Sequence, residues 1–379
     1  MLSITFLPHL KQHVRLARLI CCLPFEWGPY TDNLIPLKGK LHRVLVRGQM
    51  MLQLVHTICQ LIFTAGSTRS TNTKMQTMVF TSIYVTGHFL RWNWQLDTVA
   101  MELLNSFINF ERKFFHGHHF KKSIMDLLMS LVLPIVIFSC FTIPIFTTCL
   151  LLAFPCQPPF IGSMLPSCAE GGDGIQNKWM KLLIAIFEGY MFYQVTVSGA
   201  FFITQVMIAG CLSLWNYVNI LKQWTQTHSC KKGALLQAYK YFRVLEMLNN
   251  NCIRARMFPV GTIGFPAVQF FSGYVCIKFH STMSIFAVGV FFLLYCDGVI
   301  LTTATFTTAA HVYINSRELL KRWKSGWGTR RNSELRKTLR AFGPLRVRCG
   351  TNFVDNSTPL VIQDMCTRQT VSTLIISKE

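Results

Sequence analysis

Apolar runs long enough to cross a lipid bilayer recur along this chain, and polar stretches separate them. A transmembrane helix needs about 20 mostly apolar residues, and this criterion predicts seven spans. The predicted spans are residues 50–66, 76–98, 124–153, 179–210, 258–275, 281–310 and 357–377. Pro134 and Pro144 fall inside the third span, where we expect kinks. The pattern predicts an all-α, polytopic membrane protein with seven transmembrane helices.

The composition of the chain combines many apolar residues with few charged ones. Hydrophobic residues make up 51 % of its 379 residues and charged residues only 14 %, whereas a soluble domain has about 25 % charged residues. Phe alone occurs 31 times. A protein this apolar has more hydrophobic surface than water-soluble cores can bury, which supports the membrane prediction.

The Lys and Arg residues are distributed unevenly among the segments that separate the spans. Of 37 such residues, 29 lie in residues 1–49, 99–123, 211–257 and 311–356, and five lie in the alternate segments. Cytoplasmic loops of membrane proteins carry an excess of Lys and Arg. We therefore expect a cytoplasmic N-terminus, an extracellular C-terminus and a multi-pass protein of the plasma membrane.

This orientation divides the chain into four regions. They are a cytoplasmic N-terminal segment (1–49), the first six transmembrane helices with their loops (50–310), a basic cytoplasmic loop (311–356), and the seventh helix with a short extracellular tail (357–379). The basic stretch 328–350 then lies near an anionic leaflet that attracts Lys and Arg. Nucleic-acid-binding proteins are basic too, but they are not usually apolar along most of their length. We expect a lipid bilayer, and no nucleic acid, as the partner of these charges.

Two of the basic segments contain patterns of helices outside the membrane. Residues 234–252 have apolar positions at near-helical spacing, so the fourth span is expected to continue as a cytoplasmic helix. Residues 316–328 and 332–344 each predict a short helix that ends at Gly or Pro. Together these segments predict a small helical layer on the cytoplasmic side.

Sequence motifs of enzymes are absent: there is no Gly-rich phosphate loop, no HExxH, no CxxC and no GxSxG. We therefore expect no enzymatic activity, no catalytic residues and no cofactor. The cluster of His116, His118 and His119 has no acidic or Cys partner nearby and is interpreted as polar loop residues rather than as a metal site.

Two of the 14 cysteines, Cys156 and Cys168, fall in the long predicted extracellular loop 154–178. Disulfides form and persist in oxidising compartments such as the cell exterior. These two residues are therefore a candidate disulfide pair, and the sequence leaves open whether they are bonded.

Ionisable residues inside membrane spans are costly and are candidates for function. Glu188 lies in the fourth span and Asp297 lies deep in the sixth. The seventh span carries Asp364 and Arg368 four residues apart, on one side of the helix. This pair could simply neutralise itself within the bundle, but we favour a span that lines a watery path. The expected pore-lining residues are Asp364, Arg368, Gln369, Thr370 and Thr373.

Aromatic residues in the outer halves of spans two, three, four and six predict a pocket for a small molecule. Pockets of this kind have apolar and aromatic walls with a few polar groups. The expected ligand-binding residues are Phe80, Tyr84, Phe146, Tyr190, Tyr193 and Phe286. Core packing explains these aromatic residues equally well.

The stretch LRAFGPLRVRCGTNFVDNSTPLVIQDMCTRQTVSTLI (339–375) resembles the segment that enters the last span of arthropod gustatory receptors. Leu345, Gly350 and Phe353 stand for the Leu-rich turn, the Gly and the aromatic residue of that segment. The seven spans, the cytoplasmic N-terminus and the basic inner loops are likewise similar to the insect-type chemoreceptor superfamily of gustatory and odorant receptors. The resemblance leaves the choice between these two groups open.

The resemblance implies a ligand-gated, nonselective cation channel that assembles as a homo- or hetero-tetramer. The last span of each subunit would line a central pore, and the cytoplasmic helical layer would join the subunits. A small tastant or odorant would bind among the outer halves of the other spans and shift the population toward the open state.

Two other classes of membrane protein are the alternatives. A G-protein-coupled receptor has seven spans, but its orientation is inverted, and the chain lacks Asp-Arg-Tyr and Asn-Pro-x-x-Tyr motifs. A secondary transporter is suggested by Glu188 and Asp297, although no internal repeat is detectable.

Overall fold

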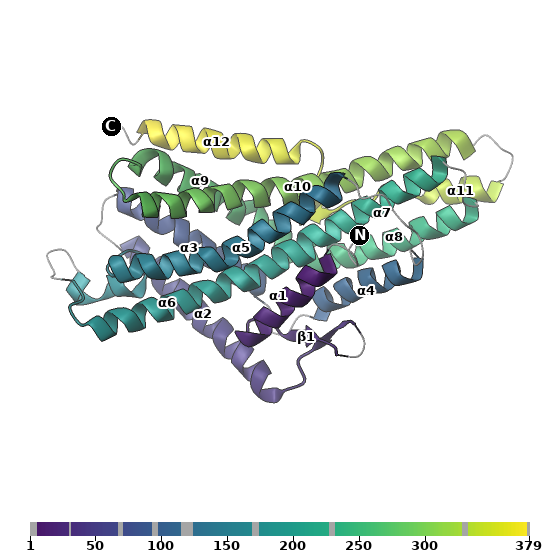
Figure 1. Ribbon diagram of the computed structural model, residues 1–379. Coiled ribbons are helices and arrows are strands. Elements are labelled where there is room, and N and C mark those ends of the chain that lie inside the picture. The colour runs from purple at the N-terminus through teal and green to yellow at the C-terminus, as the bar shows by residue number, and fades with distance from the viewer. Residues whose placement is uncertain are drawn as a thin grey trace.

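The computed structural model describes residues 6–29, 32–66, 71–92, 98–114, 124–168, 174–226, 232–327 and 333–376. This part of the chain forms one long helical bundle with two short β-hairpins (Figure 1), which confirms the predicted all-α class. The hairpins pair β1 (Phe25–Trp27) with β2 (Leu34–Pro36), and β3 (Arg348–Cys349) with β4 (Asn352–Phe353), both antiparallel.

The α-helices are α1 (Leu7–Leu19), α2 (Lys40–Gly66), α3 (Thr71–Arg91), α4 (Thr98–Phe114), α5 (Ile124–Ala153), α6 (Lys178–Ala200), α7 (Ala209–Gln226), α8 (Lys232–Cys252), α9 (Phe258–Phe279), α10 (Ile285–Trp327), α11 (Ser333–Ala341) and α12 (Thr358–Ile376). Two π-helical segments, η4 (Phe201–Ile208) and η5 (Ile253–Met257), join α6 to α7 and α8 to α9 without a break. The 3₁₀ turns η2 (Ile161–Met164) and η3 (Pro166–Cys168) follow α5.

Three helical runs extend along most of the bundle. They are α6–η4–α7 with 49 residues, α8–η5–α9 with 48 residues and α10 with 43 residues. At about 1.5 Å per residue each run is roughly 65–75 Å long, about twice the thickness of a bilayer's hydrocarbon core. Each run can therefore cross a membrane and still extend well beyond it.

The long runs correct two predictions about helices outside the membrane. Residues 234–252 form α8, which continues into α9, so this helix extends the fifth predicted span and not the fourth. The fourth span is instead extended by α7. Residues 316–327 are the last part of α10 rather than a separate helix, because no Pro or Gly interrupts the chain between Ala310 and Ser325.

Four helical runs of the described residues are long and apolar enough to cross a membrane by length and composition: Pro134–Ala153, Lys178–Gln226, Lys232–Phe279 and Ile285–Gly326. The bounds predicted for the third span coincide with α5. The predicted first, second and seventh spans correspond to α2, α3 and α12, which are helical but more polar. The second was predicted too far along the chain, since α3 ends at Arg91 and a new helix, α4, begins at Thr98.

Two hydrophobic clusters fill the bundle, one toward each end. The first lies among α1, α4, α7, α8 and the second half of α10, around Tyr217, Tyr239 and Trp323. The second lies among α3, α5, α6, α9 and the first half of α10, around Phe80 and Phe192. We call the end formed by α4, α8 and α11 the layer end, and the end that carries residues 154–168 the loop end (Figure 1).

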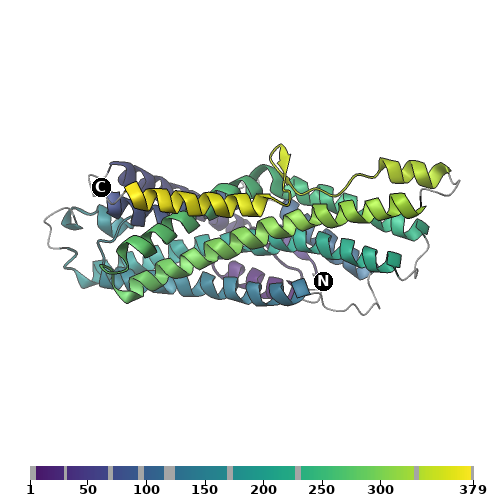
Figure 2. The ribbon, with the colours of Figure 1, turned by 90° about the horizontal axis from the view of Figure 1, so that it is seen from above.

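Helix α12 lies on the outside of the bundle, along its top in Figure 1 and in front of the other helices in Figure 2. It packs mainly on α9 and along one side of α10. Of its side chains, only Ile362 and Cys366 are fully buried. Most of its surface therefore has no partner within the described part of this chain.

Leu345, Gly350 and Phe353, the three residues on which the family resemblance rests, lie in the segment just before α12. Gly350 has φ +58° and makes the β3–β4 turn, where its N–H donates to the carbonyl of Arg254 over 3.0 Å. Leu345 is fully buried, and Phe353 packs on Tyr313 with ring centres 5.0 Å apart.

Candidate functional site

A cavity of about 120 Å³ lies in the middle of the bundle, between α3, α5, α6, η4, α9 and α10. Its walls are mainly apolar, and they include Ile83, Val136, Ile143, Phe192 and Leu294. Ser139, Thr196 and Asp297 are among the few polar residues that line it. An apolar cavity with a few polar groups is the usual form of a small-molecule site.

Small residues determine how closely the helices approach around this cavity. Gly87 and Gly199 line it from facing helices, and a Cβ atom on Gly199 would lie 3.8 Å from the Cα of Gly87. On α10, a Cβ atom at Gly298 would lie only 3.1 Å from the Cα of Gln269. Because two of the atoms that this Cβ would meet belong to the backbone of Gln269, α9 and α10 would have to move apart by a few tenths of an ångström to accept a larger residue.

Asp297 is the one acidic residue among those that line the cavity. Its Oδ1 lies 3.1 Å from the hydroxyl of Ser139, which is also 3.0 Å from the carbonyl of Ile135. A hydroxyl has one proton to donate, so these two oxygens share a single donor. Among the described residues no Lys, Arg or His forms an ion pair with Asp297.

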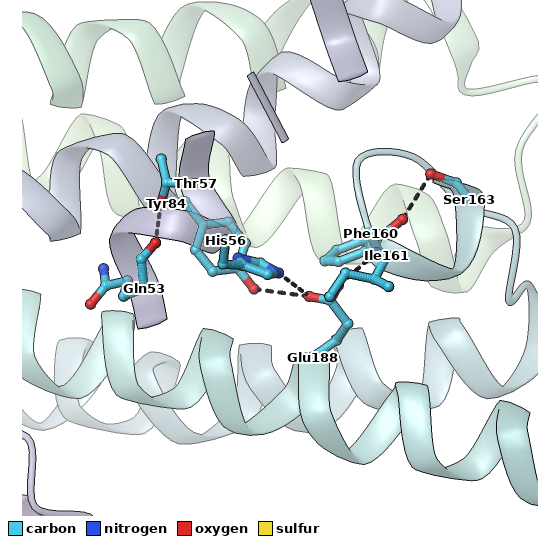
Figure 3. Close-up of polar contacts among 8 residues, drawn as sticks. All are labelled: Gln53, His56, Thr57, Tyr84, Phe160, Ile161, Ser163 and Glu188. Atoms are coloured by element: carbon cyan, nitrogen blue, oxygen red, sulfur yellow. Dashed lines mark hydrogen bonds and ion pairs between the residues drawn. The ribbon is translucent and has the colours of Figure 1, made fainter. Parts of the chain in front are cut away.

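A second buried carboxylate, Glu188 on α6, has a full set of partners (Figure 3). Its Oε2 lies 3.1 Å from Nε2 of His56 on α2 and 3.4 Å from the hydroxyl of Tyr84 on α3. Its Oε1 accepts a hydrogen bond of 2.7 Å from the N–H of Ile161 in η2. Both Glu188 and His56 are almost completely buried. Glu188 therefore ties three elements to α6 through one side chain.

The loop that Glu188 holds is closed by a disulfide between Cys156 and Cys168, whose Cα atoms are 5.4 Å apart. Within this loop the ring of Phe160 packs on Phe80 at a centre-to-centre distance of 5.0 Å, and the hydroxyl of Ser163 donates to the carbonyl of Phe160 (Figure 3). The disulfide, the aromatic contact and the Glu188 hydrogen bond fix the loop against the loop end of the bundle.

The six predicted ligand-binding residues do not line the cavity. Phe80 and Tyr84 are fully buried in the second hydrophobic cluster and both pack on Phe192. Because Phe192 itself lines the cavity, these two residues form its outer support. The cavity lies farther from the loop end than the predicted pocket: on α10, for example, its lining begins at Leu294, whereas the predicted residue is Phe286.

The other four predicted residues lie near the surface in three separate places. Phe146 and Phe286 pack edge to face at 5.2 Å, with Phe286 exposed. Tyr190 is exposed, and its hydroxyl accepts hydrogen bonds from Gln49 and Gln194. Tyr193 packs on Phe141.

The predicted pore-lining residues divide between two faces of α12. Asp364 and Arg368 form an ion pair of 2.9 Å on the face turned away from α9, and their side chains are 58 % and 78 % exposed. Gln369 is exposed as well. Thr370 and Thr373 are half-buried on the bundle side, and their hydroxyls donate to carbonyls of their own helix.

The link between α12 and the cavity region is a pair of glutamines. Gln269 on α9 and Gln363 on α12 exchange amide hydrogen bonds of 2.8 Å and 3.3 Å. Gln269 is the residue that packs against Gly298, next to Asp297. This pair could not be predicted from the sequence, because a single Gln on each of two helices forms no pattern.

A buried polar cluster around Arg91 was likewise not predicted from the sequence. The guanidinium donates to the side-chain oxygens of Gln49, Gln53 and Gln194, and two of these glutamines donate in turn to the carbonyl of Ile20 at the end of α1. A cation near a helix C-terminus is favourable, so this cluster fastens α1 to the bundle. The feature of the sequence that could have indicated this cluster is the position of Arg91 inside a predicted span.

Metal binding has no support in the described residues, which contain no group of three His, Cys, Asp or Glu side chains that could hold an ion. The cluster of His116, His118 and His119 lies outside the described residues.

Comparisons with known proteins found similarity at the level of the fold. No protein-family model matches the sequence, and no curated protein matches it. The structure of the insect olfactory receptor OR5 from Machilis hrabei is similar, with a TM-score of 0.61 and 13 % identity over 99 % of this chain and 100 % of that one. The same receptor in complex with eugenol gives 0.58 and 15 %, over 97 % and 98 %. The chain therefore has the fold of an insect olfactory receptor along nearly its whole length.

Proposed function

We propose that this chain is a chemosensory receptor of the insect-type chemoreceptor superfamily. It acts in the plasma membrane as a ligand-gated, nonselective cation channel that a small tastant or odorant opens. The fold match over nearly the full length of both chains supports this proposal, as does a mainly apolar cavity in the middle of the bundle.

The observation that carries the proposal is the position of α12. This helix lies on the outside of the bundle (Figure 1), and the Asp364–Arg368 pair is exposed on it. Charged side chains that face lipid are costly, so this face must meet water or protein. In a symmetric tetramer, four copies of α12 would surround a central path, with Asp364, Arg368 and Gln369 on the water-facing or subunit-facing side.

The orientation in the membrane follows the distribution of charge. The layer end carries most of the Lys and Arg residues, so it would lie in the cytoplasm and the loop end outside. Seven crossings, by α2, α3, α5, α6, α9, α10 and α12, then leave the disulfide-closed loop in the extracellular space, where a disulfide is stable.

Gating would couple the cavity to α12 through α9 and α10. Both helices line the cavity and both contact α12, and the Gln269–Gln363 pair joins α9 to α12 beside Gly298. A ligand that fits the cavity better in the open arrangement shifts the population toward it. OR5 has a structure in complex with the small molecule eugenol, and by analogy we assign a small organic ligand to this chain.

Whole-cell recording in expressing cells tests the function. The expected result is a current evoked by at least one member of a panel of sugars, bitter compounds and volatiles, carried by both Na⁺ and K⁺ and absent in untransfected cells. Uptake of a radiolabelled compound without current would favour a transporter. An extracellular N-terminal epitope tag would favour a G-protein-coupled receptor and contradict the channel.

A further inference from the structure

We infer that the central cavity recognises a small organic amine in its protonated form, and that the carboxylate of Asp297 is its counter-ion. This inference deepens the proposed function, because it names the chemical class of ligand that would open the channel. It rests on the composition of the cavity wall, on the missing partner of Asp297 and on the size of the cavity.

The charge of Asp297 has no compensation in the described structure. Ionisable side chains inside membrane bundles almost always pair with one another or with polar groups of the protein. Glu188 follows this rule, since both of its oxygens accept hydrogen bonds and His56 lies against it. Asp297 has only the shared hydroxyl of Ser139 on Oδ1, and no described residue donates to Oδ2. A cationic ligand would supply the missing partner.

The polar groups of the cavity suit an ammonium group. The hydroxyl of Ser139 donates its one proton to either Ile135 or Asp297, and its oxygen keeps lone pairs that can accept a hydrogen bond. An ammonium nitrogen near Oδ2 of Asp297 could donate to the carboxylate and to Ser139 together. Hydrogen bonds between charged groups are roughly twice as strong as those between neutral groups.

The rest of the wall suits an alkyl chain rather than a metal ion. Ile83, Val136, Ile143 and Leu294 offer no oxygen ligands, whereas hard cations are held by about six or more oxygens. The volume, about 120 Å³, is close to that of an engineered apolar cavity of about 150 Å³ that binds benzene in another protein. An amine with about four to six heavy atoms is therefore the expected ligand.

The test compares isopentylamine with isopentanol, which has nearly the same shape but no charge at pH 7. Both are added to the purified receptor in detergent, and the midpoint of thermal unfolding is measured. We expect the amine to stabilise the unmodified receptor more than the alcohol does, and Asp297→Asn to abolish this difference. Asp32→Asn, which removes an exposed carboxylate far from the cavity, is the matched control and should retain the difference.

In the current assay, Asp297→Asn should raise the concentration of isopentylamine for half-maximal response by about ten-fold or more. The response to isopentanol should change much less. Ser139→Ala should give an intermediate effect, because the carboxylate remains.

Three results would overturn the inference. They are an amine that stabilises no better than the alcohol, an Asp297→Asn variant that still prefers the amine, and an Asp297-dependent stabilisation by NaCl over KCl, which would mark a sodium site. If the amine stabilises through Asp297 but no compound evokes current, the proposed channel function fails and the inference stands.

Discussion

Glu188 and Asp297 are two acidic residues in the interior of the same bundle, and their surroundings differ in one respect. Glu188 meets donors from α2, α3 and η2, so both of its oxygens have partners. Asp297 meets one shared hydroxyl and faces an apolar cavity. A buried carboxylate is costly unless it is paired and hydrogen-bonded.

This difference assigns a structural role to Glu188 and, in our inference, a binding role to Asp297. The contacts of Glu188 are complete within the chain, so its contribution is to hold the disulfide-closed loop and α2 in place. The contacts of Asp297 are incomplete, so a partner from outside the chain can complete them. Both residues stand out in the sequence as acids inside predicted spans, and only their neighbours distinguish them.

The largest expected effect is on stability when the paired carboxylate is removed. Glu188→Ala leaves His56, Tyr84 and the Ile161 N–H without their acceptor, and the loss of one member of a buried pair costs about 3–5 kcal/mol. We expect a large fall in the thermal midpoint of the purified protein in detergent and in its surface expression. Asp297→Asn should leave the midpoint unchanged or raise it. An equal loss in both variants would remove the distinction between the two carboxylates.

A smaller effect is expected when the loop held by Glu188 loses its covalent closure. Cys156→Ser opens the disulfide to Cys168, which lies 12 positions along the chain, and such a change costs about 2–4 kcal/mol. A reducing agent should lower the midpoint of the unmodified protein by a similar amount and should not affect the variant. Cys59→Ser, at an exposed free cysteine, is the control. A midpoint of Cys156→Ser equal to that of the control would contradict a structural role for the loop.

The smallest effect is expected at the longest hydrogen bond of Glu188. Tyr84→Phe removes only the hydroxyl that lies 3.4 Å from the carboxylate, so about 0.5–1.5 kcal/mol should be lost. The aromatic contact with Phe192 remains. Thermal unfolding of the single variant and of its combination with Glu188→Ala measures the effect. If Tyr84→Phe destabilises equally in both backgrounds, its hydroxyl does not act through Glu188.

The sequence allowed the positions of the helices to be predicted better than the contacts that their side chains make. The bounds of α5 were predicted because its long apolar run begins after the basic pair Lys121-Lys122 and ends just before Pro155. The continuous α10 was divided wrongly, because polarity changes along it although no residue breaks the helix. Periodicity and hydropathy are local properties, so they locate elements without saying what each side chain meets.

For the candidate site, too, local sequence patterns did not show which side chains come into contact. The positions of Glu188 and Asp297 inside spans marked both as functional candidates, but their different roles depend on His56 and Ile161, which are 132 and 27 residues away from Glu188. The predicted aromatic pocket and the observed cavity share the same group of helices. They differ in depth, because the cavity is lined mainly by aliphatic residues such as Ile83 and Leu294, with Phe192 and Phe265, and not by the aromatic residues that were predicted. Three of the five residues predicted for the pore face outward on α12, whereas Thr370 and Thr373 turn toward the bundle; whether any of them lines a pore remains a prediction.

The most direct test of the proposed channel is the accessibility of α12 to a water-soluble thiol reagent during ligand-evoked current. Cysteines are introduced singly at Asp364 and Gln369, which are exposed, and at Ile362, which is buried against the bundle. The proposal predicts that the reagent reduces the evoked current in the Asp364→Cys and Gln369→Cys variants and leaves Ile362→Cys and the unmodified receptor unchanged. An evoked current that persists unaltered in both exposed variants would contradict a pore lined by α12.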